Sequence, residues 1–322
     1  MSFLYVNNYF TMRQFYCFLT NQLAFICVLI YSTQAAGLFG PRQTKVQISD
    51  ENIKEASGLA LSRVHPNVAY THNDRGDVSR FFAIDLSTGN TVATFYVNNA
   101  TNTDWEDMAY GPCFDDCRSG TCSADVKPSR YCLYIADIGD NGGHGAADVI
   151  YAVQEPASLQ DGSVDLVGVL RFNWTEPDAE TLLLSPDGRF FIVSKVSGGQ
   201  AKISQLPATA WNSGSVVDLD ESKMATLQIN TTSNDPQGGD ISPDGKQLLL
   251  IAEHNIYYFG VPDGDYIKAF ENQPPSAVDT YDRVKDSEGI AWAPDQLGFY
   301  IIPEGKNISV YYYPRENDVV VG

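Results

Sequence analysis

One motif recurs five times along the chain, and this repeat constrains the fold more than any other feature of the sequence. Each copy opens with an acidic residue, continues into a short apolar run and ends in a turn. The five copies begin at Glu55, Asp104, Asp178, Asp235 and Asp286. A second apolar run follows each turn, and two of the turns read Ser-Pro-Asp-Gly, in which proline presets φ and glycine tolerates a positive φ. Repeats with starting points spaced in this way predict an array of similar supersecondary units.

Each unit is predicted to supply about four β-strands. After the first hairpin come the apolar runs 81–86 and 91–97, and no segment shows a clear amphipathic helical period. Four short strands per unit are typical of a β-propeller. We therefore expect an all-β fold, a single five-bladed β-propeller over residues 37–322, with six blades as the alternative. Residues 44–49 are expected to act as an N-terminal strand that closes the last blade and so removes an open sheet edge.

Charge narrows the classes of partner. The chain has 322 residues with 21 Lys and Arg against 40 Asp and Glu, which gives a formal net charge of −19. Nucleic-acid polymers and anionic membranes bind clusters of basic residues, so this balance argues against both as partners. It favours cations instead. The hydrophobic fraction of 43% is sufficient for a folded core.

Residues 1–36 read as a targeting segment. They contain one basic residue, Arg13, and no acidic residue, and an interrupted apolar stretch from Phe15 to Tyr31 precedes several small residues. This pattern predicts a signal peptide cleaved near Ala35 or Ala36, and therefore a secreted protein with no membrane attachment after cleavage. An uncleaved membrane anchor is the alternative, although its apolar run is short for a bilayer span. The tidier n-region after Met12 raises the hypothesis that Met12, not Met1, is the initiator.

Cysteines and sequons agree with an extracellular protein. Four cysteines remain beyond the targeting segment, at 113, 117, 122 and 132, within one predicted loop. In a secreted chain they are expected to form two disulfides, and three pairings are possible. A zinc site is the alternative, but the spacing lacks paired Cys-x-x-Cys motifs. Glycosylation is predicted at four Asn-x-Ser/Thr sequons, namely Asn99, Asn173, Asn230 and Asn307.

Acidic residues recur at two fixed positions of the repeat. Counted back from the end of the first apolar run, the position seven residues earlier is acidic in every unit. The position five residues earlier carries the side chains that we expect to converge on the central channel, and these are Ser57, Glu106, Glu180, Gln237 and Glu288. Converging carboxylates repel one another unless a cation or shared protons neutralise them. An all-oxygen ring suits Ca²⁺ better than Zn²⁺ or Mg²⁺, so the sequence predicts a calcium site here. The alternative, structural hydrogen bonding, is assigned mainly to the acids seven residues back.

The predicted second strands end on the same face as this ring. They carry Asp74 and Asp137, which are candidate general bases, and Arg75 and Lys195, which are candidate holders of anionic oxygens. The chain has no Gly-x-Ser-x-Gly elbow, no His-Glu-x-x-His and no phosphate loop with Lys-Ser/Thr. If the protein is an enzyme, a water activated by the metal is therefore the expected nucleophile.

These residues resemble those of the calcium-activated nucleotidase (apyrase) family. Members of that family are secreted five-bladed propellers with one calcium ion in the channel, held by a ring that reads Ser, Glu, Glu, Ser, Glu, so the resemblance implies the same fold and metal here. Its Asp-Asp-Arg-Thr-Gly motif resembles Asn73-Asp74-Arg75-Gly76. This chain departs from the family at Gln237 and Asn73, and it has only Lys195 where the family has an arginine-rich patch. The segments EASGLALS, THNDRGD, DWEDMA and YIADIGDN also resemble uncharacterised secreted bacterial propellers.

Two functions are compatible with these observations. The first is a non-catalytic extracellular protein with one channel calcium, whose unidentified ligand is a protein, a glycan or a small anionic molecule. The second is a calcium-dependent hydrolase acting on a phosphoanhydride or a lactone-type ester. The residues at the end of the channel distinguish the two functions, because the hydrolase needs Asp74 and Arg75 beside the metal.

Overall fold

The computed structural model describes residues 37–117, 122–140, 147–195, 200–229 and 235–316, together with the backbone of two strands nearer the N-terminus. Those strands, β1 (Arg13–Leu19) and β2 (Phe25–Tyr31), form an antiparallel hairpin within a separate compact unit, Met1–Gln34. The predicted cleavage region at 32–36 lies outside the described residues. The second unit is Ala35–Gly322. Within the described parts of the chain, no helix has the length and apolar character needed to cross a bilayer.

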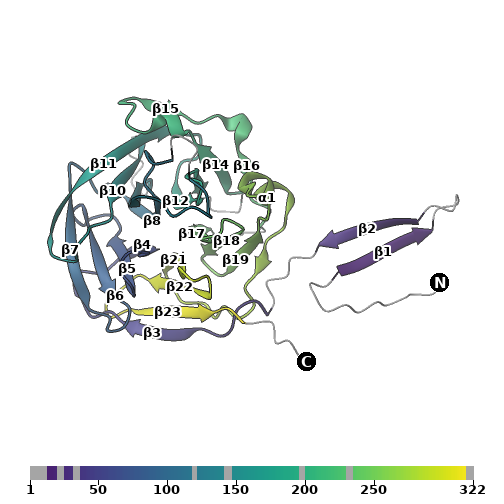
Figure 1. Ribbon diagram of the computed structural model, residues 1–322, viewed down its shortest axis with the longest axis horizontal. Coiled ribbons are helices and arrows are strands. Elements are labelled where there is room, and N and C mark those ends of the chain that lie inside the picture. The colour runs from purple at the N-terminus through teal and green to yellow at the C-terminus, as the bar shows by residue number, and fades with distance from the viewer. Residues whose placement is uncertain are drawn as a thin grey trace. The chain divides into compact units, whose positions relative to one another are not determined.

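Each acidic repeat forms one buried strand followed by an antiparallel partner (Figure 1). The first strands of the repeats are β4 (Ala56–Leu61), β8 (Trp105–Pro112), β12 (Ala179–Leu184), β17 (Pro236–Ile241) and β21 (Ser287–Trp292). Their partners are β5 (Val68–Asn73), β9 (Tyr131–Asp137), β13 (Phe190–Ser194), β18 (Gln247–Ala252) and β22 (Gly298–Pro303). The predicted hairpins are therefore present in all five repeats.

Outer strands complete four-stranded antiparallel arrays. They are β6 (Arg80–Asp85), β7 (Thr91–Asn98), β10 (Asp148–Gln154), β11 (Gly162–Asn173), β14 (Lys202–Leu206), β16 (Ala225–Thr226), β19 (Ile256–Gly260), β20 (Ser276–Ala277) and β23 (Ser309–Pro314). The long strand β11 pairs with β10 and also, in parallel, with β7, so the first two arrays are joined in one sheet. A short strand, β15 (Val216–Asp218), pairs in parallel with the end of β11.

The strand β3 (Gln43–Gln47) belongs to the last array. It pairs antiparallel with β23, and Val46 lies opposite Val310. The pairing that the sequence predicts for residues 44–49 is thus present, although the strand begins one residue earlier and ends two earlier. Residues from the beginning and the end of the unit therefore share one sheet.

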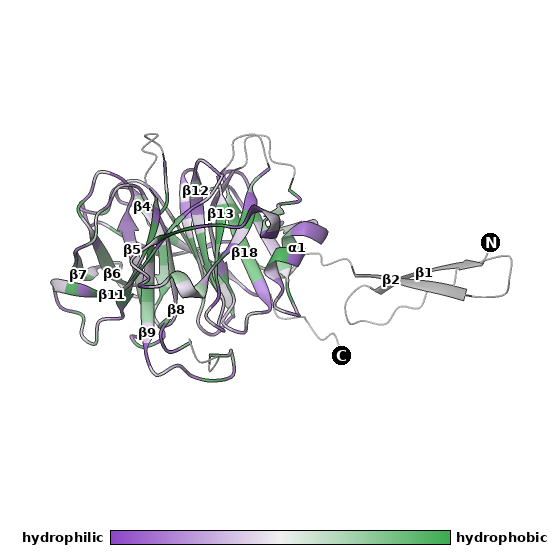
Figure 2. Cartoon of the chain, turned by 90° about the horizontal axis from the view of Figure 1, so that it is seen from above, coloured by the Kyte–Doolittle hydropathy of each residue, from purple (hydrophilic) through white to green (hydrophobic). Residues whose placement is uncertain are grey.

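The apolar core lies between neighbouring arrays. Tyr134 and Phe172 of the second array pack in one cluster with Leu182 and Phe190 of the third, and each of the other clusters likewise draws on two neighbouring arrays. Figure 2 shows the apolar residues concentrated along the strands. The first strands of the repeats contact one another in the order β4, β8, β12, β17, β21, and β21 contacts β4. Four-stranded sheets arranged in this way around an axis form a β-propeller.

The sequence did not predict the helix α1 (Tyr266–Asn272). Its N-cap, Asp265, accepts a hydrogen bond from the Lys268 amide at 3.1 Å, and its buried face consists of Tyr266, Ala269 and Phe270. Seven residues make about two helical turns, so the i, i+3, i+4 pattern is too short to stand out in the sequence. Two 3₁₀ turns, Ala208–Ala210 and Glu221–Lys223, were also not predicted.

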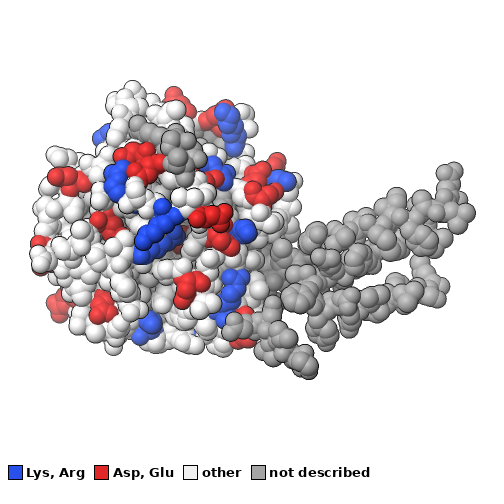
Figure 3. Space-filling model, in the orientation of Figure 1, with Lys and Arg blue, Asp and Glu red and all other residues white. Residues whose placement is uncertain are grey.

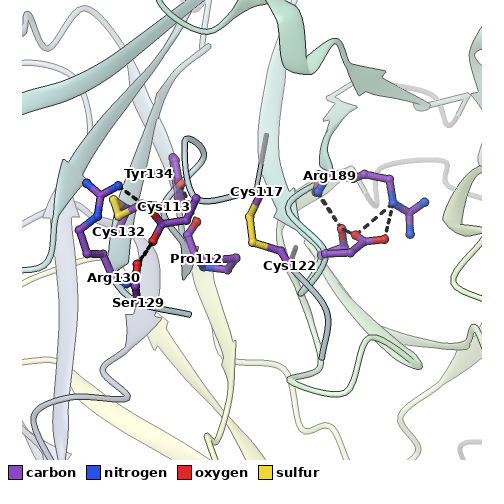
Figure 4. The surroundings of a disulfide bond; sticks show 12 residues. Pro112, Cys113, Cys117, Cys122, Ser129, Arg130, Cys132, Tyr134 and Arg189 are labelled. Atoms are coloured by element: carbon purple, nitrogen blue, oxygen red, sulfur yellow. Dashed lines mark hydrogen bonds and ion pairs between the residues drawn. A yellow bond between two sulfur atoms is a disulfide. The ribbon is translucent and has the colours of Figure 1, made fainter. Parts of the chain in front are cut away.

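Both predicted disulfides are present in the loop between β8 and β9 (Figure 4). Cys113 pairs with Cys132, and Cys117 pairs with Cys122. The first bridge ties the end of β8 to the start of β9, next to a hydrogen bond of 2.7 Å from the Tyr134 hydroxyl to the Pro112 carbonyl. All four sulfur atoms are used in this pairing, so none remains as a zinc ligand.

Candidate functional site

A β-bulge recurs at the repeat position that the sequence assigns to the channel. In β8, β12, β17 and β21, the register against the second strand shifts across a single residue that has no partner in the ladder. Those unpartnered residues are Glu106, Glu180, Gln237 and Glu288. A bulge redirects the side chain of the extra residue and is frequent beside functional sites. In β4 the shift falls between Ser57 and Ala60, and Ser57 itself stays paired with His72.

A second repeated contact fixes the ends of the second strands beside this ring. The first residues after these strands donate amide hydrogen bonds to the carbonyls of the acidic residues that open the repeats. The pairs are Asp74 to Glu55 at 2.8 Å, Ile138 to Asp104 at 3.2 Å, Lys195 to Asp178 at 2.9 Å, Glu253 to Asp235 at 3.2 Å and Glu304 to Asp286 at 2.7 Å. Asp74, Lys195, Glu253 and Glu304 therefore hold equivalent places at the end of the propeller where the bulges lie.

Three carboxylates from two neighbouring arrays meet at this end. One oxygen from each of Asp74, Asp104 and Glu106 lies within 4.8 Å of the others, and we call these residues the acid cluster. Asp104 and Glu106 are buried and Asp74 is partly buried. The Arg75 Nε lies 3.8 Å from Asp104 Oδ1, but this guanidinium is 50% exposed. Among the described residues, the ion-pair partner of the acid cluster is thus Arg75, and this pair is long and half-exposed.

Glu106 is the least compensated member of the acid cluster. Its side chain is buried, and its Oε1 atom has no hydrogen-bond partner among the described residues. Its backbone carbonyl accepts a hydrogen bond from the Ser57 hydroxyl, which ties the first repeat to the second. A buried carboxylate oxygen without a partner is costly, because it has lost water and gained nothing in return.

Gly139 allows the acid cluster to pack tightly. A Cβ atom added at this position would overlap Glu106 Oε1 and lie 2.7 Å from the Asp104 carboxyl carbon. The loop after β9 therefore passes closer to these carboxylates than any side chain would permit. Sequence reasoning missed Asp104, which it assigned to backbone capping. The available signal was the Asp-x-Glu spacing in a unit whose second strand is followed by Ile-Gly.

Glu180 is compensated in a different way. The Lys195 ammonium contacts Glu180 Oε1, whereas Glu180 Oε2 is buried without a hydrogen-bond partner among the described residues. Lys195, which the sequence proposes as a holder of anionic ligands, thus already pairs with a carboxylate of the ring. Gln237 is partly buried at its bulge, and Glu288 is partly buried at the bulge of β21.

The pKa values of the carboxylic acids at this end are raised. Burial is the first cause in each case, followed by repulsion from neighbouring carboxylates. The pKa rises to about 6 for Asp74, to about 7 for Glu304 and to about 8 for Glu180, where Lys195 opposes the shift. The pKa values of Glu106 and Glu288 lie well above the usual range. Protons therefore compete with any cation for this site.

Asp137 lies behind the acid cluster. Its Oδ1 accepts hydrogen bonds from the Thr103 amide at 3.1 Å and from the Asp104 amide at 2.8 Å. The structure thus gives this predicted general base a role in holding the backbone of Asp104. Figure 3 shows acidic and basic side chains gathered toward the middle of one face of the molecule.

The donor set of the acid cluster fits a hard cation. The cluster offers carboxylate oxygens from three residues, and neither cysteine nor histidine belongs to the metal-ligating group found in the described residues. Ca²⁺ takes six to eight such oxygen ligands, whereas Zn²⁺ prefers nitrogen and sulfur. The unpartnered Oε1 atom of Glu106 is the atom that a cation would satisfy.

Comparison with known proteins gives no family assignment. No family model matches the chain, and no curated protein is similar to it in sequence. Solved structures that match the chain include the following two. The PQQ-bound aldose sugar dehydrogenase of Streptomyces coelicolor has a TM-score of 0.48 and 10% identity over 85% of this chain and 98% of its own. The major allergen Mala s 1 of Malassezia sympodialis has a TM-score of 0.49 and 9% identity over 87% and 97%. The resemblance to calcium-activated nucleotidases stays a prediction from the sequence.

Proposed function

We propose that this protein is a secreted five-bladed β-propeller that binds one calcium ion at the end of its channel. Five blades are supported by the five hairpin repeats and by the five core clusters, each of which lies between two neighbouring arrays of strands. The pairing of β3 with β23 supplies the fourth strand of the fifth blade and would close the ring. The repeats leave no further set of four strands for a sixth blade within the described residues.

Glu106 carries the calcium proposal. Its Oε1 atom is buried without a hydrogen bond, beside carboxylate oxygens of Asp74 and Asp104. The acid cluster would hold the ion on one side, and the remaining ring residues Ser57, Glu180, Gln237 and Glu288 surround the same end of the channel. A bound calcium ion would supply the positive charge that these carboxylates lack, and it would polarise an oxygen of any ligand that reaches it.

The principal role that we propose is binding rather than catalysis. The disulfides and the predicted signal segment favour an extracellular setting. Calcium is abundant there, and it occupies and stabilises extracellular modules even when their affinity for calcium is low. The ligand would be a protein, a glycan or a small anionic molecule held at the channel mouth. Net negative charge argues against a nucleic-acid polymer.

Asp74 favours a second candidate function, a calcium-dependent hydrolase. Its pKa of about 6 suits a general base near neutral pH, and it lies at the same mouth as Arg75. In this reaction the Asp74 carboxylate would take a proton from water, and the exposed Arg75 guanidinium would bind an anionic oxygen of the substrate. Phosphoanhydrides and lactone-type esters are the substrate classes to test.

Thermal unfolding of the chelator-treated protein tests the binding proposal. Calcium at 100 times its Kd should stabilise the folded state by about 2.7 kcal/mol, because it binds only that state. The variant Glu106→Gln should lose this stabilisation, whereas Glu253→Gln should keep it. Glu253 is a matched control because it occupies the blade position of Asp74 but pairs with Arg283 in solvent. An equal response to magnesium, or an equal response of Glu106→Gln, would refute the proposal.

Turnover separates the two candidate functions. A release assay over nucleoside di- and triphosphates and over lactones should show no calcium-dependent hydrolysis if the protein only binds. If hydrolysis occurs, Asp74→Asn should abolish it while the protein stays folded. Persistence of turnover in Asp74→Asn would remove Asp74 from the catalytic role.

A further inference from the structure

We propose that Lys195 is a built-in counter-ion that pairs with the ring residue Glu180 and lowers the affinity of the site for calcium. This inference rests on the calcium site proposed above and concerns what sets its strength. It places the ion on the side of the acid cluster, away from Glu180, and it makes Lys195 a residue that tunes the affinity of the site.

The blade position of Lys195 is the first support. The equivalent residues in the other hairpins include Asp74, Glu253 and Glu304, all of them acidic. Only the third repeat places a cation at this position. Its amide donates to the Asp178 carbonyl in the same way as the acidic equivalents donate in their own blades, so the backbone is unchanged and only the charge is reversed.

The contacts of Lys195 are the second support. Its ammonium contacts Glu180 Oε1, and the two side chains are 28% and 3% exposed. A lysine ammonium is protonated at neutral pH in water, and contact with a carboxylate favours that charged form. The positive charge is thus fixed in the same group of carboxylates that the cation would join.

A fixed positive charge has two opposite consequences. It stabilises the metal-free protein, because Glu180 would otherwise be a buried carboxylate with no partner. It weakens calcium binding, because like charges repel and because one ring carboxylate is already neutralised. Glu180 already pairs with Lys195, whereas Glu106 Oε1 in the acid cluster has no hydrogen-bond partner among the described residues, so the acid cluster is the side where an ion gains most.

A structural role alone would not have this signature. If Lys195 only held the ring in shape, its removal would lower both the stability and the calcium affinity. If it acts as a counter-ion, its removal lowers the stability of the metal-free protein and raises the calcium affinity. The two readouts then move in opposite directions, and they can be measured on the same sample.

Calorimetric titration of calcium into the chelator-treated full chain is the test. Lys195→Met should bind calcium at least tenfold more tightly than the unsubstituted protein, and Lys195→Arg should stay within about twofold. Lys202→Met is the matched control, since Lys202 forms a similar half-exposed pair with buried Glu176 in the same sheet. Its calcium affinity should be unchanged.

A second variant protects the test against misfolding. Lys195→Met combined with Glu180→Gln removes both charges, so no buried carboxylate is left without a partner. This double variant should bind calcium about as tightly as the unsubstituted protein. Equal or weaker binding by Lys195→Met would overturn the counter-ion role while leaving the calcium site intact. Binding by Lys195→Met alone, with none by the parent, would support the counter-ion role and refute calcium as the natural ligand. Absence of binding in every variant would overturn both.

Discussion

Asn73 and Asp137 hold equivalent places in neighbouring blades and accept equivalent backbone hydrogen bonds with different side chains. Each is the last residue of a second strand, and each uses its Oδ1 atom to accept two backbone amides from the segment that leads into the first strand. Asn73 holds Lys54 and Glu55, and Asp137 holds Thr103 and Asp104. The amide at position 73 shows that this task needs an acceptor oxygen but no charge.

The first prediction follows from this equivalence. Asp137→Asn should preserve folding and calcium binding, because the amide oxygen can still accept both hydrogen bonds. Asp137→Ala leaves two amides without an acceptor and should cost about 1–3 kcal/mol of unfolding free energy. Chemical denaturation of the two variants measures this difference. Loss of calcium binding or of any turnover in Asp137→Asn, with stability retained, would instead give the carboxylate a direct role.

The second prediction concerns pH. The pKa values of Asp74 and Glu304 are raised to about 6 and about 7, so the folded metal-free protein holds protons that the unfolded chain has released. Its stability should therefore fall as the pH rises from about 5 to about 8. Calcium keeps these groups ionised, so this decline should flatten when the site is saturated. Melting temperatures across this pH range, with and without calcium, provide the measurement, and parallel curves would contradict it.

The third prediction concerns Gly139. Its replacement by alanine would force a Cβ atom into Glu106 Oε1 and the Asp104 carboxyl group. Gly139→Ala should thus weaken calcium binding by at least tenfold. Gly162→Ala is the control, because the nearest atom to an added Cβ there is 3.9 Å away. Calcium titration followed by intrinsic fluorescence compares the two variants. Equal affinities would show that the ion does not use these carboxylates.

The fourth prediction concerns glycans. The sequon residues Asn99, Asn173 and Asn307 are exposed. Asn99 and Asn307 lie on links between strands and Asn173 is the last residue of β11, all at the end of the propeller that holds the acid cluster. Asn230 lies outside the described residues. We expect glycans to surround the channel mouth when the chain passes through a eukaryotic secretory pathway. Each of Asn99→Gln, Asn173→Gln and Asn307→Gln should remove one glycosidase-sensitive mass increment from the secreted protein. Unchanged masses would show that these sequons are not used.

The repeat made the fold predictable, and the reason is geometric. An acidic residue, an apolar run and a Pro-Asp-Gly turn are local signals, so the hairpins β12–β13 and β17–β18 follow directly from them. The pairing of residues 44–49 with the last blade was also predictable, because an unpaired edge strand needs a partner. The parallel strand pair of β7 and β11 was not, since it joins segments whose sequences carry no signal for each other.

The composition of the site was predictable only in part. The residues of the ring could be identified by counting along the repeat, but the bulges that redirect Glu106, Glu180, Gln237 and Glu288 are a property of register. The inclusion of Asp104 depends on how closely Gly139 approaches, and the pairing of Lys195 with Glu180 depends on which way two side chains turn. Both contacts lie within one hairpin, between the start of its first strand and the end of its second, and they depend on side-chain packing that the repeat pattern does not encode.

The most direct test of the calcium site is a calorimetric titration of calcium into the chelator-treated protein, compared with Glu106→Gln and Glu253→Gln. We predict one binding event in the unsubstituted protein, the same event in Glu253→Gln, and at least a tenfold loss of affinity in Glu106→Gln. Binding of equal strength in Glu106→Gln, or no binding in the unsubstituted protein and in Lys195→Met, would contradict a metal site at the acid cluster.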